Sequence, residues 1–253
     1  MTTFSEQFPI VFQALNVGFL QTLKLFFVTL IGAIPLGLII SFGSMSRWSP
    51  LGFLRPYLKN LPKDGKLTWW QKTQLWFAVD FRPIRLIVRF VIWVVRGTPL
   101  MLQLLAVTYG PYYIWEVPVA RNKLIPVVIA FAINYAAYFA EIYRGGIESM
   151  PVGQYEAAEV LGYTKAQTFI HIILPQVFKR VMPSITNEVV TLVKDTSMAF
   201  TVSYQEMFTI GKQISNSESS FMPFLVAGVF YFVFNAVVDF VMGRVEKRMS
   251  YYK

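Results

Sequence analysis

The sequence predicts an all-α integral membrane protein with about five transmembrane helices. The chain of 253 residues is 55% hydrophobic and only 15% charged, whereas a soluble domain carries about 25% charged residues. Several segments hold the roughly 20 mostly apolar residues that a membrane-crossing helix needs. Basic residues gather in alternate connecting loops, which is typical of a multi-pass membrane protein.

Each expected span is a mostly apolar segment bounded by polar residues. The segments cover residues 16–42, 86–115, 123–147, 184–208 and 222–243. The second is interrupted at Arg96-Gly97-Thr98-Pro99. Because proline breaks a regular helix, we expect this span to be broken, with part of it lying flat at the interface. Polar residues interrupt the third and fourth spans, which favours a side that faces protein or water.

The distribution of Lys and Arg predicts the orientation. With five spans, one side of the membrane collects 18 basic residues and the other only three: Arg121, Lys123 and Lys212. Basic loops tend to stay in the cytoplasm. We therefore expect the N-terminus outside and the C-terminus in the cytoplasm. The net charge of +9 is explained by these loops, so it does not indicate nucleic acid.

The first cytoplasmic loop, residues 43–85, combines basic residues with tryptophan. Thr68 can cap a short helix whose aromatic residues fall near one face: Trp69, Trp70, Trp76 and Phe77. Trp favours the headgroup level, and Lys and Arg favour the anionic leaflet. We expect an interfacial hairpin on the inner leaflet, and the alternative is a docking surface for another subunit.

Composition argues against an enzyme. The chain has no Cys and a single His, His171, which removes thiol chemistry and Cys-based metal sites and disfavours a His-ligated metal. Gly32-x4-Gly37 is followed by Leu38-Ile39 and not by Lys-Ser/Thr, so it is no phosphate-binding loop. We expect no catalytic residue, metal or cofactor in this chain.

A polar loop at residues 148–176 separates two apolar segments. Its centre reads Glu156-Ala157-Ala158-x3-Gly162-x9-Ile172-x-Leu174-Pro175. Gly162 suits a helix end, and Thr164-x-x-Gln167 fits a capping box that starts a second helix running to Pro175. Glu156 beside two alanines gives the first helix a low face with one acid, which can lie in a groove on a partner. An ordinary solvated connector is the alternative.

This spacing resembles the EAA loop of ABC importer permeases, the part that docks into a partner ATPase. The resemblance assigns ATPase coupling to residues of this loop: Glu156, Ala157, Ala158, Gly162, Leu174 and Pro175. Three further motifs are similar to the polar-amino-acid branch of the family, which takes up histidine, glutamine, arginine and cystine. They are Arg96-Gly97-Thr98-Pro99-Leu100-x2-Gln103, Asn134-x-Ala136-Ala137-Tyr138-x-Ala140-Glu141-x2-Arg144-Gly145-Gly146-Ile147 and Lys194-Asp195-Thr196-Ser197. The match runs from about residue 90 to the end; the long, Trp-rich first loop departs from it.

The resemblance implies a type I ABC importer permease fold over one transmembrane domain, residues 1–253. It implies two ATPase subunits, a second permease (identical or paralogous), an extracytoplasmic solute-binding protein and an amino-acid substrate, whose identity stays open. ATP and Mg would belong to the ATPase, and the location would be the bacterial inner (cytoplasmic) membrane, in contact with its lipid. A stand-alone secondary transporter or channel is the alternative; it predicts inverted repeats, and the sequence shows none.

The substrate pathway is expected near polar residues inside the spans. Asn134, Tyr138 and Glu141 share one helix face at i, i+4 and i+7. An amino acid brings an ammonium and a carboxylate, so Asn134 and Tyr138 can serve either group and Asp195 can take the ammonium. Gln103 and Thr98 join them if the second span lines the pathway.

Each of these residues also has a structural interpretation. Asn134 can be an interhelical hydrogen bond, and Asp195 can pair with Arg96 or Arg144. Glu141 and Arg144 lie one turn apart, which favours an ion pair or a gate contact over ligand binding.

Overall fold

The computed structural model describes residues 4–50, 52, 68–70, 73 and 81–249. Within these ranges every regular element is helical, as the sequence predicts. The elements in chain order are α1 (Phe4–Ser44), α4 (Pro83–Gly97), α5 (Leu100–Trp115), α6 (Leu124–Glu148), α7 (Val152–Val160), α8 (Lys165–Gln167), a π-helical segment (Thr168–Ile173), α9 (Leu174–Asp195), a 3-10 segment (Thr196–Val202), α10 (Met207–Glu218) and α11 (Met222–Met249). Most of the predicted interfacial hairpin at 43–85 lies outside the described residues.

Three of the expected spans are long, apolar helices. By length and composition α6, α11 and most of α1 are able to cross a membrane, which confirms the spans predicted at 16–42, 123–147 and 222–243. At 41 residues α1 is about 60 Å long, twice the thickness of the hydrocarbon core. The helix is therefore longer than one crossing of the hydrocarbon core requires.

The second expected span is broken where the sequence indicates. α4 and α5 meet at an angle of 108°. Thr98 leaves the helix with extended backbone angles and Pro99 follows it. Proline lacks the N–H that would continue the helical hydrogen bonds, so the chain turns here and starts a new helix.

The fourth expected span, 184–208, is wrong in its bounds. Residues 184–195 belong to α9, which already starts at Leu174; the 3-10 segment follows, and α10 begins at Met207. Between them Ser203 adopts a left-handed conformation with φ 57°. The apolar residues of this segment therefore lie on both sides of a turn and pack into the protein core. Hydrophobic periodicity cannot distinguish two such buried pieces from one continuous span.

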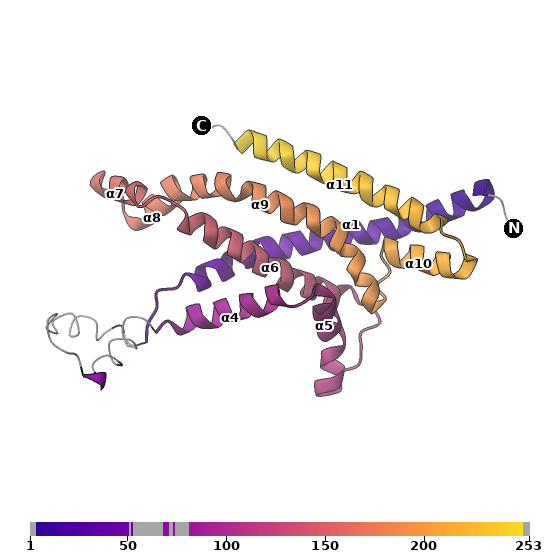
Figure 1. Ribbon diagram of the computed structural model, residues 1–253, viewed down its shortest axis with the longest axis horizontal. Coiled ribbons are helices and arrows are strands. Elements are labelled where there is room, and N and C mark those ends of the chain that lie inside the picture. Colours follow the sequence, from indigo (N-terminus) through magenta and orange to yellow (C-terminus); the bar gives the residue numbers. More distant parts are fainter. Residues whose placement is uncertain (1–3, 51, 53–67, 71–72, 74–80, 250–253) are drawn as a thin grey trace.

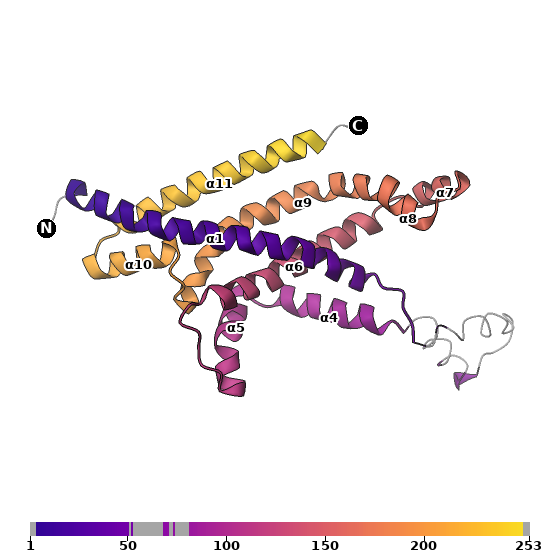
Figure 2. The same cartoon turned by 180° about the vertical axis from the view of Figure 1, so that it is seen from behind.

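α6 lies at the centre of the bundle and contacts α1, α4, α5 and α9 (Figures 1 and 2). Small residues bring these helices close together. A Cβ atom on Gly37 of α1 would lie 2.7 Å from Phe139 Cβ, and one on Gly146 of α6 would lie 2.2 Å from Val181 Cγ1 of α9. Such contacts drive helix association in membranes, where apolar burial offers little gain.

The two ends of the bundle carry different elements. α7 and α8 lie at one end, and α10 lies at the other beside the N-terminal part of α1 (Figure 1). Val11 and Leu15 of α1 pack there against Met207 of α10 and Ala227 of α11. The polar loop 148–176 is thus separated from α10 by the length of the bundle.

Candidate functional site

The loop after α6 contains a helix, a glycine turn and a second helix, as its sequence predicts. α7 ends at Val160, and Gly162, two residues later, has a φ of 78°. The Gly162 N–H donates to the Glu159 carbonyl at 3.0 Å, and the Tyr163 N–H donates to the Ala158 carbonyl at 3.0 Å. This pair of bonds is the Schellman motif, which requires a left-handed residue at the position of Gly162.

The second helix begins with the predicted capping box. The Gln167 N–H donates to Thr164 Oγ1, and the Thr164 N–H donates to Gln167 Oε1. The helix does not end at Pro175, however. It passes through the π-helical segment into α9, so Leu174 and Pro175 stand in the first turn of a 22-residue helix. The wide π turn directly precedes a proline that has no N–H to donate.

The exposed surface of α7 differs from the low face of Glu156, Ala157 and Ala158 that the sequence predicts. Glu156 and Ala157 are exposed, but Ala158 is 1% exposed and faces the protein. Val160 and Leu161 are 87% and 71% exposed. The outer surface at the end of α7 therefore combines two exposed acids, Glu156 and Glu159, with the large apolar side chains of Val160 and Leu161, a combination suited to a protein partner.

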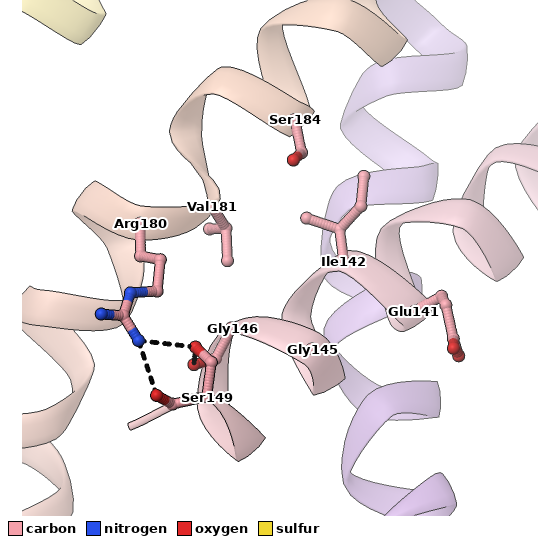
Figure 3. A pocket seen from close by; sticks show the side chains of 8 residues that line it. All are labelled: Glu141, Ile142, Gly145, Gly146, Ser149, Arg180, Val181 and Ser184. Carbon is pink, nitrogen blue, oxygen red and sulfur yellow. Dashed lines mark hydrogen bonds between the residues drawn. The ribbon is translucent and has the colours of Figure 1, made fainter. Parts of the chain in front are cut away.

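α9 is tied to the end of α6 directly before α7. One guanidinium nitrogen of Arg180, Nη1, donates to the Ser149 carbonyl at 2.6 Å and to Ser149 Oγ at 2.9 Å (Figure 3). An open pocket of about 240 Å³ lies between the two helices. It is lined by Glu141, Ile142, Gly145, Gly146, Ser149, Arg180, Val181 and Ser184 (Figure 3).

A chain of ion pairs joins α4 to α6. Arg144 contacts Glu141 and Glu148 on its own helix. From α4, Arg96 Nη1 lies 3.9 Å from Glu141 Oε1, and Arg89 Nη2 lies 3.6 Å from Glu148 Oε1. Arg89 Nε also donates to the carbonyl of Ser44, the last residue of α1, at 3.3 Å. These charges hold three helices together at the end that carries α7.

Three of the predicted pathway residues meet at the α4–α5 bend. Asn134 Nδ2 donates to Gln103 Oε1 at 3.0 Å. Gln103 Nε2 donates in turn to the Val95 carbonyl at 2.7 Å and to Thr98 Oγ1 at 2.9 Å. Gln103 thus satisfies carbonyl groups that the break leaves without helical partners. Asn134 therefore forms a hydrogen bond between α6 and α5 in this structure, which is the structural role that the sequence allowed for it.

Asp195 has a partner that the sequence did not suggest. Its Oδ2 accepts a hydrogen bond of 2.7 Å from the hydroxyl of Tyr135, which is 2% exposed. In the described part of the chain Asp195 forms no ion pair, so the expected pairing with Arg96 or Arg144 is wrong. Tyr138 lies instead beneath Arg96, whose Cζ is 5.2 Å from the ring centroid. Tyr135 was overlooked because an aromatic residue in a span is usually part of the core.

Two further carboxyl groups were also missed. Glu188 is half-buried on α9, two turns before Asp195. Glu206 is fully buried and accepts four hydrogen bonds: from the Phe208 N–H at 2.7 Å, from the Thr209 N–H and hydroxyl at 2.6 and 2.8 Å, and from the Tyr231 hydroxyl at 2.9 Å. The sequence feature that could have indicated this buried carboxylate is Tyr231, whose hydroxyl lies within an apolar span and needs a hydrogen-bond partner.

One face of α9 is polar and exposed. Its residues recur every three or four positions and are Arg180, Ser184, Asn187, Thr191 and Lys194. Polar side chains in hydrocarbon are costly and face protein or water. This stripe therefore needs a protein or aqueous neighbour that the single chain does not supply.

A bundle of apolar helices with buried polar contacts and an exposed helical loop at one end is typical of a membrane transport component. The chain belongs to the family of binding-protein-dependent transport system inner membrane components, which matches residues 75–251. It is accordingly an inner-membrane protein with the type I ABC importer permease fold.

Individual relatives agree with this family. The chain is 34% identical to the octopine transport system permease protein OccM of Rhizobium radiobacter, over 84% of this chain and 82% of that protein. It is 32% identical to the arginine transport system permease protein ArtQ of Bacillus subtilis, over 67% and 77%. A crystal structure of an amino acid ABC transporter with histidines superposes with a TM-score of 0.77 at 26% identity, covering 98% of this chain and all of that one. These relatives are permease proteins and not enzymes.

Proposed function

We propose that this chain is the permease subunit of an ATP-driven importer of polar amino acids. The observation that carries the proposal is the exposed α7 surface, with Glu156 and two large apolar side chains before a glycine turn. The relatives named for octopine and arginine, and the amino acid transporter structure, support an amino acid as the substrate.

α7 and its flanking turns form the coupling element in this proposal. Glu156, Ala157 and Gly162 determine the surface that the ATPase contacts. Ala158 packs α7 against the rest of the permease. Leu174 and Pro175 connect it to α9. Arg180 binds Ser149, and Gly146 leaves room for Val181, so α6 and α9 are packed together directly beside α7. Movement of the ATPases would therefore reach the spans through these two helices.

The remaining subunits follow from the same proposal. ATP and Mg bind to two ATPase subunits in the cytoplasm, where loop 148–176 lies, and the N-terminus is outside. A second permease, identical or paralogous, faces the polar stripe of α9 and completes the pathway. A solute-binding protein delivers the amino acid from the outside.

The pathway residues are proposed from their chemistry. Asp195 retains one oxygen that Tyr135 does not bind, and this oxygen can accept an ammonium hydrogen bond. Gln103, Thr98 and Asn134 form the bend beside α6 and can exchange their mutual hydrogen bonds for bonds to a ligand. Arg96, Glu141 and Arg144 form the gate contacts between α4 and α6.

The test is to purify the chain with its neighbouring gene products and to reconstitute them. We expect an ATPase to copurify, and we expect uptake of one polar amino acid that requires ATP and the binding protein. Uptake by the chain alone, driven by an ion gradient, would support the stand-alone transporter instead.

A further inference from the structure

We propose that the N-terminal turns of α4 bind an anionic phospholipid of the cytoplasmic leaflet through Arg82 and Arg85. The choice of leaflet depends on the proposed orientation, but the site itself does not. It arises from how Arg82, directly before α4, and the three arginines of α4 are distributed, and from what each of them contacts.

The arginines form one stripe along α4. Arg82, Arg85, Arg89 and Arg96 are separated by three, four and seven residues, so all four fall within one narrow sector of the helix. Arg89 and Arg96 have acidic partners on α6. Arg89 pairs with Glu148, and Arg96 pairs with Glu141. No carboxylate in the described part of the chain lies within ion-pair distance of Arg82 or Arg85, and the first turn of α4 contains no acid.

Arg89 lies level with the ends of α1 and α6. It contacts the last residue of α1 and the last residue of α6. Arg85 and Arg82 lie about 6 and 10 Å further along the helix axis, beyond the ends of both neighbouring helices. This is the depth at which phospholipid phosphates are found when the two helices cross the hydrocarbon core.

Among the described residues, the start of α4 carries positive charge that no ion pair balances. Two arginines stand at a helix N-terminus, where the helix dipole is also positive. A bound anion stabilises both the arginine charges and the positive end of the helix dipole. Guanidinium groups bind phosphate oxygens in a bidentate fashion. Arg82 and Arg85 are both partly buried, which restricts their side chains and favours a bound anion over screening by mobile counterions.

An adjoining apolar surface identifies the anion as a lipid. Ile84, Ile87 and Phe90 are 42%, 63% and 62% exposed and continue from the arginine stripe around the outside of α4. A free phosphate or a nucleic acid would use only the arginines, whereas a phospholipid also lays its acyl chains on these side chains. α4 begins at the same end of the bundle as α7 but on the opposite flank (Figures 1 and 2), so contact of the proposed ATPase with α7 does not by itself cover this site.

The experiment measures lipid selectivity of the intact transporter. The complex is placed in vesicles of phosphatidylcholine containing phosphatidylglycerol, and the bound lipids are counted by native mass spectrometry. We expect selective retention of phosphatidylglycerol. Near an anionic membrane each basic residue is worth about fivefold, so Arg82→Gln/Arg85→Gln should lower the preference for phosphatidylglycerol roughly 30-fold.

The control variant Arg121→Gln/Lys212→Gln removes two exposed charges from the opposite end and should leave the preference unchanged. An equal loss in this control, an unchanged preference in the α4 variant, or displacement of the lipid by inorganic phosphate would overturn the proposal. So would loss of the ATPase from the α4 variant in every lipid, because it would assign the arginines to a protein contact. A complex that retains the lipid but shows no ATP-driven uptake would contradict the proposed function and not this site.

Discussion

Replacing Gly162 by alanine should weaken ATPase binding without unfolding the permease. Gly162 has φ 78°, and a Cβ atom there would meet no atom within 4 Å. The substitution therefore causes backbone strain and no clash. A non-glycine residue in the left-handed conformation costs about 1–2 kcal/mol, which opens the turn about 5- to 30-fold more often.

The expected result is a loss of affinity by up to this factor, reached when the open turn predominates in the variant. If the ATPase binds only the closed turn, its apparent dissociation constant rises by the factor through which the closed population falls. The assay is titration of immobilised permease with purified ATPase, together with thermal unfolding of the permease alone. The unfolding midpoint should change little, because α7 projects from the bundle and contributes few buried side chains.

Two variants make the argument refutable. Gly153 also has open space around it but lies in the first turn of α7 without a positive φ, so Gly153→Ala should bind the ATPase at least as well as the native chain. Gly162→Asn should recover part of the affinity, because asparagine tolerates the left-handed conformation. Equal impairment of Gly153→Ala, or native affinity in Gly162→Ala, would show that the turn geometry does not govern docking.

Four further predictions test other parts of the chain. Glu156→Lys should leave the permease in the membrane but detach or uncouple the ATPase, measured as uptake per ATP hydrolysed; unchanged coupling would remove this acid from the docking surface. Asp195→Asn and Tyr135→Phe should lower uptake roughly tenfold or more, because a hydrogen bond to a charged group is lost, while assembly and basal ATP hydrolysis persist; a variant that fails to assemble would assign its residue to the fold. Gln167→Cys should react with an impermeant thiol reagent only after the cells are opened, and labelling of intact cells would reverse the orientation. Tyr231→Phe removes a donor from a buried carboxylate and should destabilise the protein by about 1–3 kcal/mol; an unchanged unfolding midpoint would show that water replaces the hydroxyl.

Local sequence rules predicted the polar loop well. The glycine turn, the capping box and the break at Thr98–Pro99 each depend on residues within a few positions of one another. The conformation at these positions is set by backbone sterics and by hydrogen bonds between residues close in sequence. These do not change with the rest of the fold. The exposed surface of α7 was less predictable, because Ala158 turns inward where α7 packs on the π-helical segment after Gly162.

Contacts between distant helices were predicted poorly. Asp195 was expected to meet an arginine, since unlike charges attract, but the neighbour that packing brings to it is Tyr135, sixty positions away. The same applies to Glu206, whose burial depends on α1, α10 and α11 together. A polar residue in a span signals that it needs a partner, and only the helix arrangement decides which partner it finds.

Composition, hydropathy and spacing alone predicted a multi-pass membrane protein, the three long helices that can cross a membrane, the break at Thr98–Pro99 and the helix–turn–helix form of the polar loop. These properties depend on the cost of exposing backbone and charge to lipid and on local turn geometry, both of which are functions of neighbouring residues. The tertiary structure decided the end of the fourth span, the partner of Asp195, the inward orientation of Ala158 and the two arginines of α4 left without acids. Each of these depends on which helix faces touch, and close approach at positions such as Gly37 and Gly146 selects those faces.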